Sequence, residues 1–220
     1  MRVLFIHKFF REIEFCGKLG KLFEKNGDTV LHVTQLKRDL KFIEPYSNKI
    51  NTQYDLLKEF LDIQIDDLNA EAKRLEEKYG IISLKEIYLS DRASKGRTEE
   101  YLIEKTIKYF YAWEKYLKEN PVDLMHTELG GEMCRVVPFY IGKKIGIPMT
   151  ISNWVCLPNS LNLRTEINPL YTELTSNQIE AVSDEKIDLA KQFIEKFHHK
   201  KEQHLDPFNS VSDTQLRAPE

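Results

Sequence analysis

Hydrophobic runs separated by polar turns between residues 121 and 154 predict a strand, a helix and a second strand. Residues 122–125 form a short apolar run after Pro121, as expected for a strand buried on both faces of a parallel sheet. Apolar residues then recur at helical spacing, at Met133, Val136, Val137, Tyr140, Ile141 and Ile145. Gly146 and Pro148 end this helix before the next strand.

The chain opens with the same pattern. Residues 3–6 read as a buried strand, an amphipathic helix follows as far as residues 26–28, and residues 29–34 form a second strand. Only Gly17 and Gly20 lie near the first turn, and both fall within the helical pattern. The glycine fingerprint of dinucleotide-binding folds is therefore missing, which disfavours NAD or FAD binding.

Longer helices are predicted in the middle of the chain. Residues 36–50 look irregular, whereas residues 52–79 carry a broad apolar stripe at helical spacing, which we assign to the protein's own core rather than to a partner surface. Residues 83–86 resemble a capping box for a short helix, although residues 87–89 also fit a strand. Residues 98–119 form a second strong helical pattern that is rich in aromatic residues.

Together these elements predict an α/β protein with a Rossmann-like open parallel sheet and helices on both faces. A last helix is expected from about Ser183. We expect residues 1–204 to form one Rossmann-like domain. Residues 205–220 are polar and contain proline, so we expect a flexible tail or linker there.

Composition narrows the class of protein. Charged residues make up 30% of the 220 residues and hydrophobic residues 41%, with a net charge of −3, so no basic field favours nucleic acid. No apolar run approaches the roughly 20 residues that span a bilayer. We therefore predict a cytoplasmic protein. The three scattered cysteines favour reduced thiols over a disulfide framework or a zinc site: Cys16, Cys134 and Cys156.

Candidate site residues follow from the rule that ligands bind at the carboxyl ends of the strands. The rule selects Glu128, Gly130, Gly131 and Glu132 after one strand, and Asn153 and Trp154 after the next. Partial burial would raise the pKa of Glu128 toward that of a useful base; a helix cap or an ion pair is the alternative. The two glycines would let a ligand approach the backbone, although a tight turn also needs glycine.

Other charged residues extend this candidate site. Arg92 and Arg97 can bind carboxylate or phosphate bidentately, with Asp91 to orient a hydroxyl group or an arginine; a solvated loop is the alternative. Arg135 lies one helical turn after the glycines and can reach the same edge. His7 ends the first strand and is either a ligand-binding or a structural histidine.

Trp154 and the histidines near the end of the chain each allow two interpretations. Trp154 can stack on a sugar or pack in the core. Three histidines near the end of the chain lie in a charged segment, which favours a solvated helix end over a metal site, so no metal is predicted: His198, His199 and His204.

The organisation of residues 3–34, with a strand, a phenylalanine-rich turn, a helix and a second strand, resembles the first unit of GT-B glycosyltransferases. The loop at Asp91 and Arg92, the turn at residues 128–132 and the helix that ends at residues 146–148 are similar to bacterial capsular or surface polysaccharide biosynthesis proteins of that superfamily. The resemblance covers about residues 1–200.

This resemblance implies the N-terminal half of a GT-B fold, which binds the acceptor and faces a C-terminal half that binds a nucleotide-sugar. Glu128 is then the first candidate for the base that takes a proton from the acceptor hydroxyl, and Asp91 the second. Arg92, Arg97 and Arg135 would hold an acidic group of the acceptor. The nucleotide-sugar is expected as a substrate, with no further cofactor.

The resemblance also sets expectations about partners. Nothing after residue 200 can form the second half, so transfer would need a C-terminal domain or a partner subunit, and the chain alone is expected to be inactive. A glycan or lipid-linked acceptor would bring the protein to a membrane assembly at the inner face of the membrane. Two rival functions stay open: a non-catalytic glycan-binding or scaffold domain, and a relative of nucleotide-sugar 2-epimerases.

Overall fold

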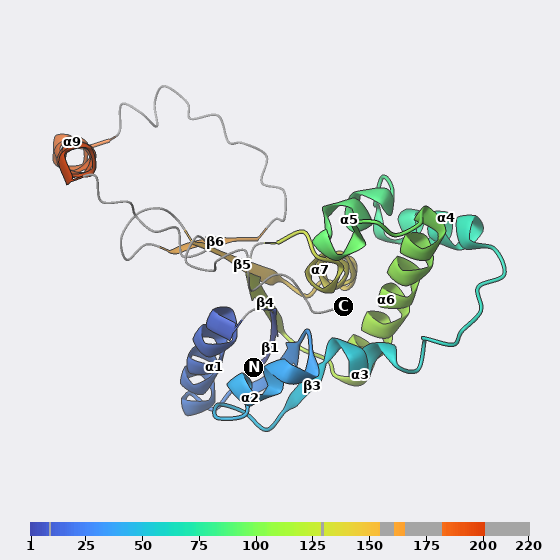
Figure 1. Cartoon of the computed structure of the whole chain (residues 1–220). Coiled ribbons are helices and arrows are strands. Elements are labelled where there is room, and N and C mark those ends of the chain that lie inside the picture. Colours follow the sequence, from blue (N-terminus) through green and yellow to red (C-terminus); the bar gives the residue numbers. More distant parts are fainter. Residues whose placement is uncertain (9, 129, 155–160, 166–181, 201–220) are drawn as a thin grey trace. The chain divides into compact units, whose positions relative to one another are not determined.

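A computed structural model describes residues 1–8, 10–128, 130–154, 161–165 and 182–200 (Figure 1). Its strands are β1 (Arg2–His7), β2 (Thr29–Thr34), β3 (Ile50–Thr52), β4 (Leu124–Glu128), β5 (Met149–Trp154) and β6 (Leu161–Arg164). Its α-helices are α1 (Phe10–Lys25), α2 (Leu40–Ile43), α3 (Gln53–Leu57), α4 (Leu68–Tyr79), α5 (Lys85–Ser90), α6 (Glu99–Glu119), α7 (Met133–Ile145) and α9 (Asp184–Lys200). Two short 3-10 helices are η1 (Lys37–Asp39) and η2 (Arg92–Ser94).

The chain divides into two compact units. The first comprises residues 1–153 and 161–168 and contains almost the whole sheet; the second comprises residues 154–160 and 169–220 and contains α9. The predicted boundary at residue 204 and the predicted tail at 205–220 lie outside the described residues.

The sheet has the strand order β3-β2-β1-β4-β5-β6. Strands β3, β2, β1, β4 and β5 run parallel, with Ile6 of β1 opposite Val33 on one side and Thr127 on the other. The chain first builds outward from β1 to β3 and then returns to place β4 on the opposite side of β1. The prediction of an open, Rossmann-like parallel sheet is confirmed, and its topological switch point lies between β1 and β4.

Helices cover both faces of this sheet, as predicted. Along β1, Val3 and Phe5 pack in a smaller core with residues of α1, whereas Leu4 and Ile6 belong to a larger core formed with α4 to α7. Figure 1 shows α1 and α7 on opposite sides of the strands. The uninterrupted apolar run of β1 is explained by this burial on both faces.

The aromatic-rich helix α6 faces the protein's own core. Thr98 caps its start by accepting a hydrogen bond from the backbone N–H of Tyr101. Ile107, Phe110 and Trp113 are fully buried in the larger core, and α6 packs against α3, α4, α5 and, most extensively, α7. Burying these three side chains stabilises the fold by about 2 kcal/mol or more for each.

Two secondary-structure predictions were wrong. Residues 52–79 form two helices, α3 and α4, because the side chain of Asp67 accepts a hydrogen bond from the N–H of Ala70 and starts a new helix. Residues 36–50 are more regular than predicted, since they contain η1, α2 and the start of β3. A smaller difference is that β4 begins at Leu124 and runs through Glu128, so Glu128 is the last residue of the strand.

Among the described residues, no helix combines the length and hydrophobicity that a membrane crossing requires.

Candidate functional site

Charged side chains from four elements meet at the carboxyl ends of β1 and β4. We call them the edge cluster: Lys8, Glu12, Glu128, Glu132 and Arg135. Lys8 follows β1, Glu12 lies in the first turn of α1, Glu128 ends β4, and Glu132 and Arg135 lie at the start of α7. All but Lys8 are buried. The cluster therefore occupies the topological switch point, where open parallel sheets bind their ligands.

Arg135 holds the edge cluster together. Its Nη2 atom lies 2.6 Å from Oε2 of Glu12 and 4.0 Å from Oε2 of Glu128, and its Nη1 atom lies 3.5 Å from Oε2 of Glu132. The residue is 2% exposed. One guanidinium group thus compensates three buried carboxylates, the fork geometry for which arginine is suited.

Lys8 supplies the second positive charge. Its Nζ donates to Oε1 of Glu132 over 3.1 Å, and its backbone N–H donates to Oε2 of Glu12 over 3.0 Å. Burial raises the pKa of Glu132, but Arg135 and Lys8 outweigh it and keep that pKa below its ordinary value. With three carboxylates and two cations, the cluster carries a net charge of about −1 when all five groups are ionised.

The glycine turn packs tightly against this cluster. A Cβ atom at Gly130 would overlap the carboxylate of Glu132 and the guanidinium of Arg135, so a larger residue there would force these two side chains to move. The carbonyl of Gly131 accepts a 2.6 Å hydrogen bond from the hydroxyl of Ser90, at the end of α5. Both glycines selected from the sequence therefore lie beside the edge cluster, and packing is part of their role. Their role in binding a ligand stays a prediction.

Asp91 reaches the same edge from another element. It is 7% exposed; its Oδ1 accepts from the N–H of Ala93 and its Oδ2 from the N–H of Met133, the first residue of α7. Asp91 therefore ties η2 to the start of α7. Its predicted catalytic role stays a prediction.

The predicted arginines are placed differently from one another. Arg135 is buried in the edge cluster, whereas Arg92 and Arg97 are exposed beside η2. The guanidinium carbon of Arg97 lies 5.6 Å from the centre of the Tyr101 ring. Arg92 and Arg97 remain accessible to an acidic ligand. Asn153 and Trp154 are the last two residues of β5.

Three histidines form a row on the α1 side of the sheet, next to the edge cluster. This histidine row consists of His7, His32 and His126, from β1, β2 and β4. Nε2 of His7 lies 3.1 Å from Nδ1 of His32, and the ring of Phe5 lies between His32 and His126 with centroid distances of 5.4 Å to each. All three are buried, so the row is built to hold neutral imidazole rings.

The histidine row predicts an acid-sensitive fold. Burial lowers the pKa of His32 and of His126, each to about 4, and burial together with His32 and Arg135 holds the pKa of His7 well below its ordinary value of 6.5. The unfolded chain binds these protons near pH 6.5 and the folded chain only near pH 4, so the free energy of unfolding falls as pH falls through that window. We expect a loss of roughly 3 kcal/mol for each of His32 and His126.

Urea unfolding at pH 7 and pH 5 measures about 2 kcal/mol of this loss for each of the two histidines, because the folded pKa of about 4 is not yet reached at pH 5. The variant His32→Leu with His126→Leu is expected to show a much smaller difference between the two pH values, because the carboxylates titrate mostly below pH 5. An unchanged difference in that variant would assign the acid sensitivity to other groups.

The described cysteines are buried free thiols. Burial raises the pKa of Cys16 well above its ordinary value and that of Cys134 to about 12, which makes both poor nucleophiles. Cys156 lies outside the described residues. Over the part of the chain that the structure describes, no group of three or more His, Cys, Asp or Glu residues could hold a metal ion.

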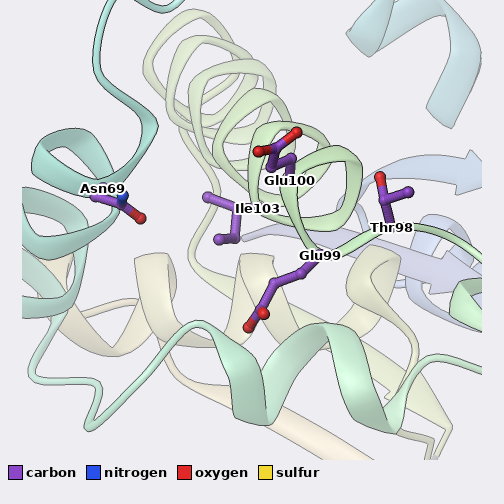
Figure 2. Close-up of a pocket in the computed structure, with 5 residues that line it drawn as sticks. All are labelled: Asn69, Thr98, Glu99, Glu100 and Ile103. Carbon is purple, nitrogen blue, oxygen red and sulfur yellow. The ribbon is translucent and has the colours of Figure 1, made fainter.

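A hollow of about 520 Å³ lies away from the edge cluster. Figure 2 shows its lining, which comes from the starts of α4 and α6: Asn69, Thr98, Glu99, Glu100 and Ile103. Glu99 is exposed and already accepts hydrogen bonds from Lys85 and Tyr88. The hollow shares no residue with the edge cluster, so the candidate site remains at the switch point.

Lys8, Glu12 and the histidines at 32 and 126 were not predicted as site residues. The same carboxyl-end rule, applied to β1, would have selected Lys8 and the first turn of α1, because β1 and β4 are neighbours. No signal in the sequence pairs His32 with His7, since that contact depends on which strands lie side by side.

Comparisons with known proteins give similarities to solved structures only. No protein-family model matches the chain, and no curated protein does. Among solved structures, the chain is similar to the crystal structure of CalG4, the calicheamicin glycosyltransferase, with a TM-score of 0.36 and 11% identity over 90% of this chain and 42% of that one. The chain therefore spans less than half the length of that glycosyltransferase.

Proposed function

We propose that this chain is the acceptor-binding half of a glycosyltransferase that acts in surface or capsular polysaccharide biosynthesis. The observation that carries the proposal is the position of Glu128. It ends β4 at the topological switch point, is 7% exposed, and lies 4.0 Å from the guanidinium of Arg135. A buried carboxylate at that edge is suitably placed to accept a proton from a bound hydroxyl group.

The neighbouring charges support this role for Glu128. The guanidinium of Arg135 favours the ionised carboxylate, which is the form that accepts a proton. Glu12 and Glu132 share the same guanidinium, so Arg135 does not fully neutralise Glu128. A donor-binding half, in the same chain or in a partner subunit, would supply the nucleotide-sugar and stabilise its leaving phosphate.

The acceptor is proposed to be a glycan, free or lipid-linked, with an acidic group that Arg92 and Arg97 bind. Both arginines are exposed, and η2 is joined to the edge cluster through the bond from Met133 to Asp91. If the acceptor is lipid-linked, the protein would act in the cytoplasm, at the inner face of the membrane.

Calorimetric titration of the 220-residue chain with acidic and neutral oligosaccharides tests this acceptor site. Arg92→Ala and Arg97→Ala are each expected to weaken binding of the acidic oligosaccharide by roughly ten- to a hundredfold, since each removes a charge-assisted hydrogen bond. Lys95→Ala, from the same exposed loop, is the matched control and should change affinity little. Equal losses in all three variants would indicate a general effect of charge and would count against a site at η2.

A further inference from the structure

The segment after β2 exposes apolar and basic side chains together. We call this surface the basic apolar patch, with six members: Leu36, Lys37, Arg38, Lys41, Phe42 and Tyr54. Tyr54 is 50% exposed, Leu36 41% and Phe42 37%. Large apolar side chains that are exposed together and flanked by charged residues are typical of a surface that binds a partner or a membrane.

The backbone explains how these residues come to share one surface. Residues 37–43 form a continuous helical run, η1 followed by α2, in which Asp39 and Ile43 face inward at a spacing of four residues. The same spacing places Lys37 with Lys41 and Arg38 with Phe42 on the outer side. Tyr54 joins them from α3, because the Nζ atom of Lys37 lies 4.9 Å from the centre of its ring.

The acidic residue within this run is turned away from the surface. Asp39 is 7% exposed, and its Oδ2 accepts a 3.0 Å hydrogen bond from the backbone N–H of Leu36. Its Oδ1 lies 4.0 Å from Nε of Arg38, whose side chain is 80% exposed. The outer side of the run therefore presents Lys37, Arg38 and Lys41, with the one acid of residues 37–43 buried behind them. Glu44, just beyond the run, is the nearest exposed acid in sequence.

Lysine and aromatic side chains are also interleaved on this surface. The Nζ atom of Lys41 lies 4.9 Å from the centre of the Phe42 ring, as that of Lys37 does from Tyr54. Proteins that lie on a membrane place tyrosine at the level of the lipid head groups. Their lysine side chains run along apolar surface and extend the ammonium groups outward.

We infer that the basic apolar patch docks the protein on an anionic membrane surface. Three exposed cations attract acidic head groups, and Leu36, Phe42 and Tyr54 can enter the boundary between head groups and acyl chains. Nucleic acid is the less suitable occupant, because Leu36 offers no ring for stacking on a base. Leu36 and Tyr54 follow the carboxyl ends of β2 and β3, so docking would bring the carboxyl edge of the sheet toward the membrane.

Co-sedimentation of the full chain with lipid vesicles tests this inference without any sugar or donor. Partition onto vesicles that contain phosphatidylglycerol is expected, and partition onto pure phosphatidylcholine vesicles is expected to be much weaker. Each basic residue near the surface contributes roughly fivefold, so Lys37→Gln with Lys41→Gln should lower the partition coefficient about thirtyfold. Added salt should weaken binding in the same direction.

Two matched controls separate the patch from general effects. Lys73→Gln with Lys118→Gln makes the same change of net charge at exposed positions of α4 and α6, and should change partition by less than about twofold. Leu36→Ser should weaken partition, whereas Ile82→Ser should not, although Ile82 is 87% exposed. Melting temperatures of all variants confirm that they fold.

Three outcomes would overturn the inference: no partition onto phosphatidylglycerol vesicles, equal losses in patch and control variants, or a dimer that Lys37→Gln with Lys41→Gln dissociates in the absence of vesicle binding. The last would assign the patch to a second copy of the chain. Because this assay contains no glycan, its failure leaves the acceptor site untouched, and failure of the acceptor site leaves this assay untouched.

Discussion

Replacing Glu128 with glutamine in the complete enzyme is expected to lower turnover by roughly two to four orders of magnitude, with little change in acceptor binding. Glutamine keeps the shape of the side chain and some of its hydrogen bonding at the end of β4, but its amide cannot take a proton from the acceptor hydroxyl. Steady-state turnover and acceptor affinity, measured separately, check the two halves of this prediction.

Glu100→Gln is the matched control, because it makes the same chemical change at an exposed position in the first turn of α6. Its turnover should equal that of the native enzyme. Unchanged turnover in Glu128→Gln would remove Glu128 from the mechanism and leave Asp91 as the next candidate. A fall in acceptor affinity without a fall in turnover would instead describe a binding residue.

The second large effect is expected from Arg135→Met. Removing the guanidinium leaves Glu12, Glu128 and Glu132 buried without their main compensating charge, which costs about 3–5 kcal/mol of unfolding free energy. Urea unfolding at neutral pH measures the loss. Because the surrounding carboxylates can take up protons, the penalty should shrink as pH is lowered toward 5.

Arg74→Met provides the comparison on the surface. Arg74 also pairs with a glutamate, Glu71, at 2.6 Å, but its side chain is 52% exposed, so its loss should cost about 1 kcal/mol or less. Adding Glu12→Gln to Arg135→Met should recover part of the lost stability, since it removes one uncompensated charge. If Arg135→Met costs no more than Arg74→Met, the edge cluster does not depend on Arg135.

The parts of the fold that the sequence predicted are those with strong local signals. The strands at the start of the chain and the unit around α7 have short, mainly apolar runs, and these runs exist because both faces of the sheet are covered. The long helix α6 was predicted from its aromatic spacing, and the structure shows that Trp113 and Phe110 face the core.

The errors fall where the local signal is ambiguous. Residues 58–67 contain enough apolar residues to continue a helix, but Leu61, Ile63 and Ile65 are spaced by two, and Asp67 starts a new helix. The edge strand β3 has three residues and one buried side chain, which is too short for a periodic pattern.

The sequence indicated where the candidate site lies in the fold, but it did not indicate which of its side chains contact one another. The carboxyl-end rule selected Glu128, Gly130, Gly131 and Glu132 because these residues end or follow a single strand, and the structure places them in or beside the edge cluster. Their role in binding stays a prediction. The pairing of Arg135 with Glu12, 123 residues away in sequence, depends on β1 and β4 being neighbours. Long-range ion pairs of this kind need the tertiary fold, and the sequence therefore indicated an acceptor-binding role for Arg135 without its buried partners.

The most direct measurement is an NMR titration of the 220-residue chain with oligosaccharides, in which shifts of the backbone amide signals show where the oligosaccharide binds. The proposed function predicts that an acidic oligosaccharide shifts the amides of Gly130, Gly131 and Glu132, and that UDP alone leaves them unchanged. Shifts caused by UDP and not by the oligosaccharide would contradict an acceptor-binding half and favour an epimerase-like nucleotide-sugar site. No shift at this edge with any oligosaccharide would contradict the placement of the site itself.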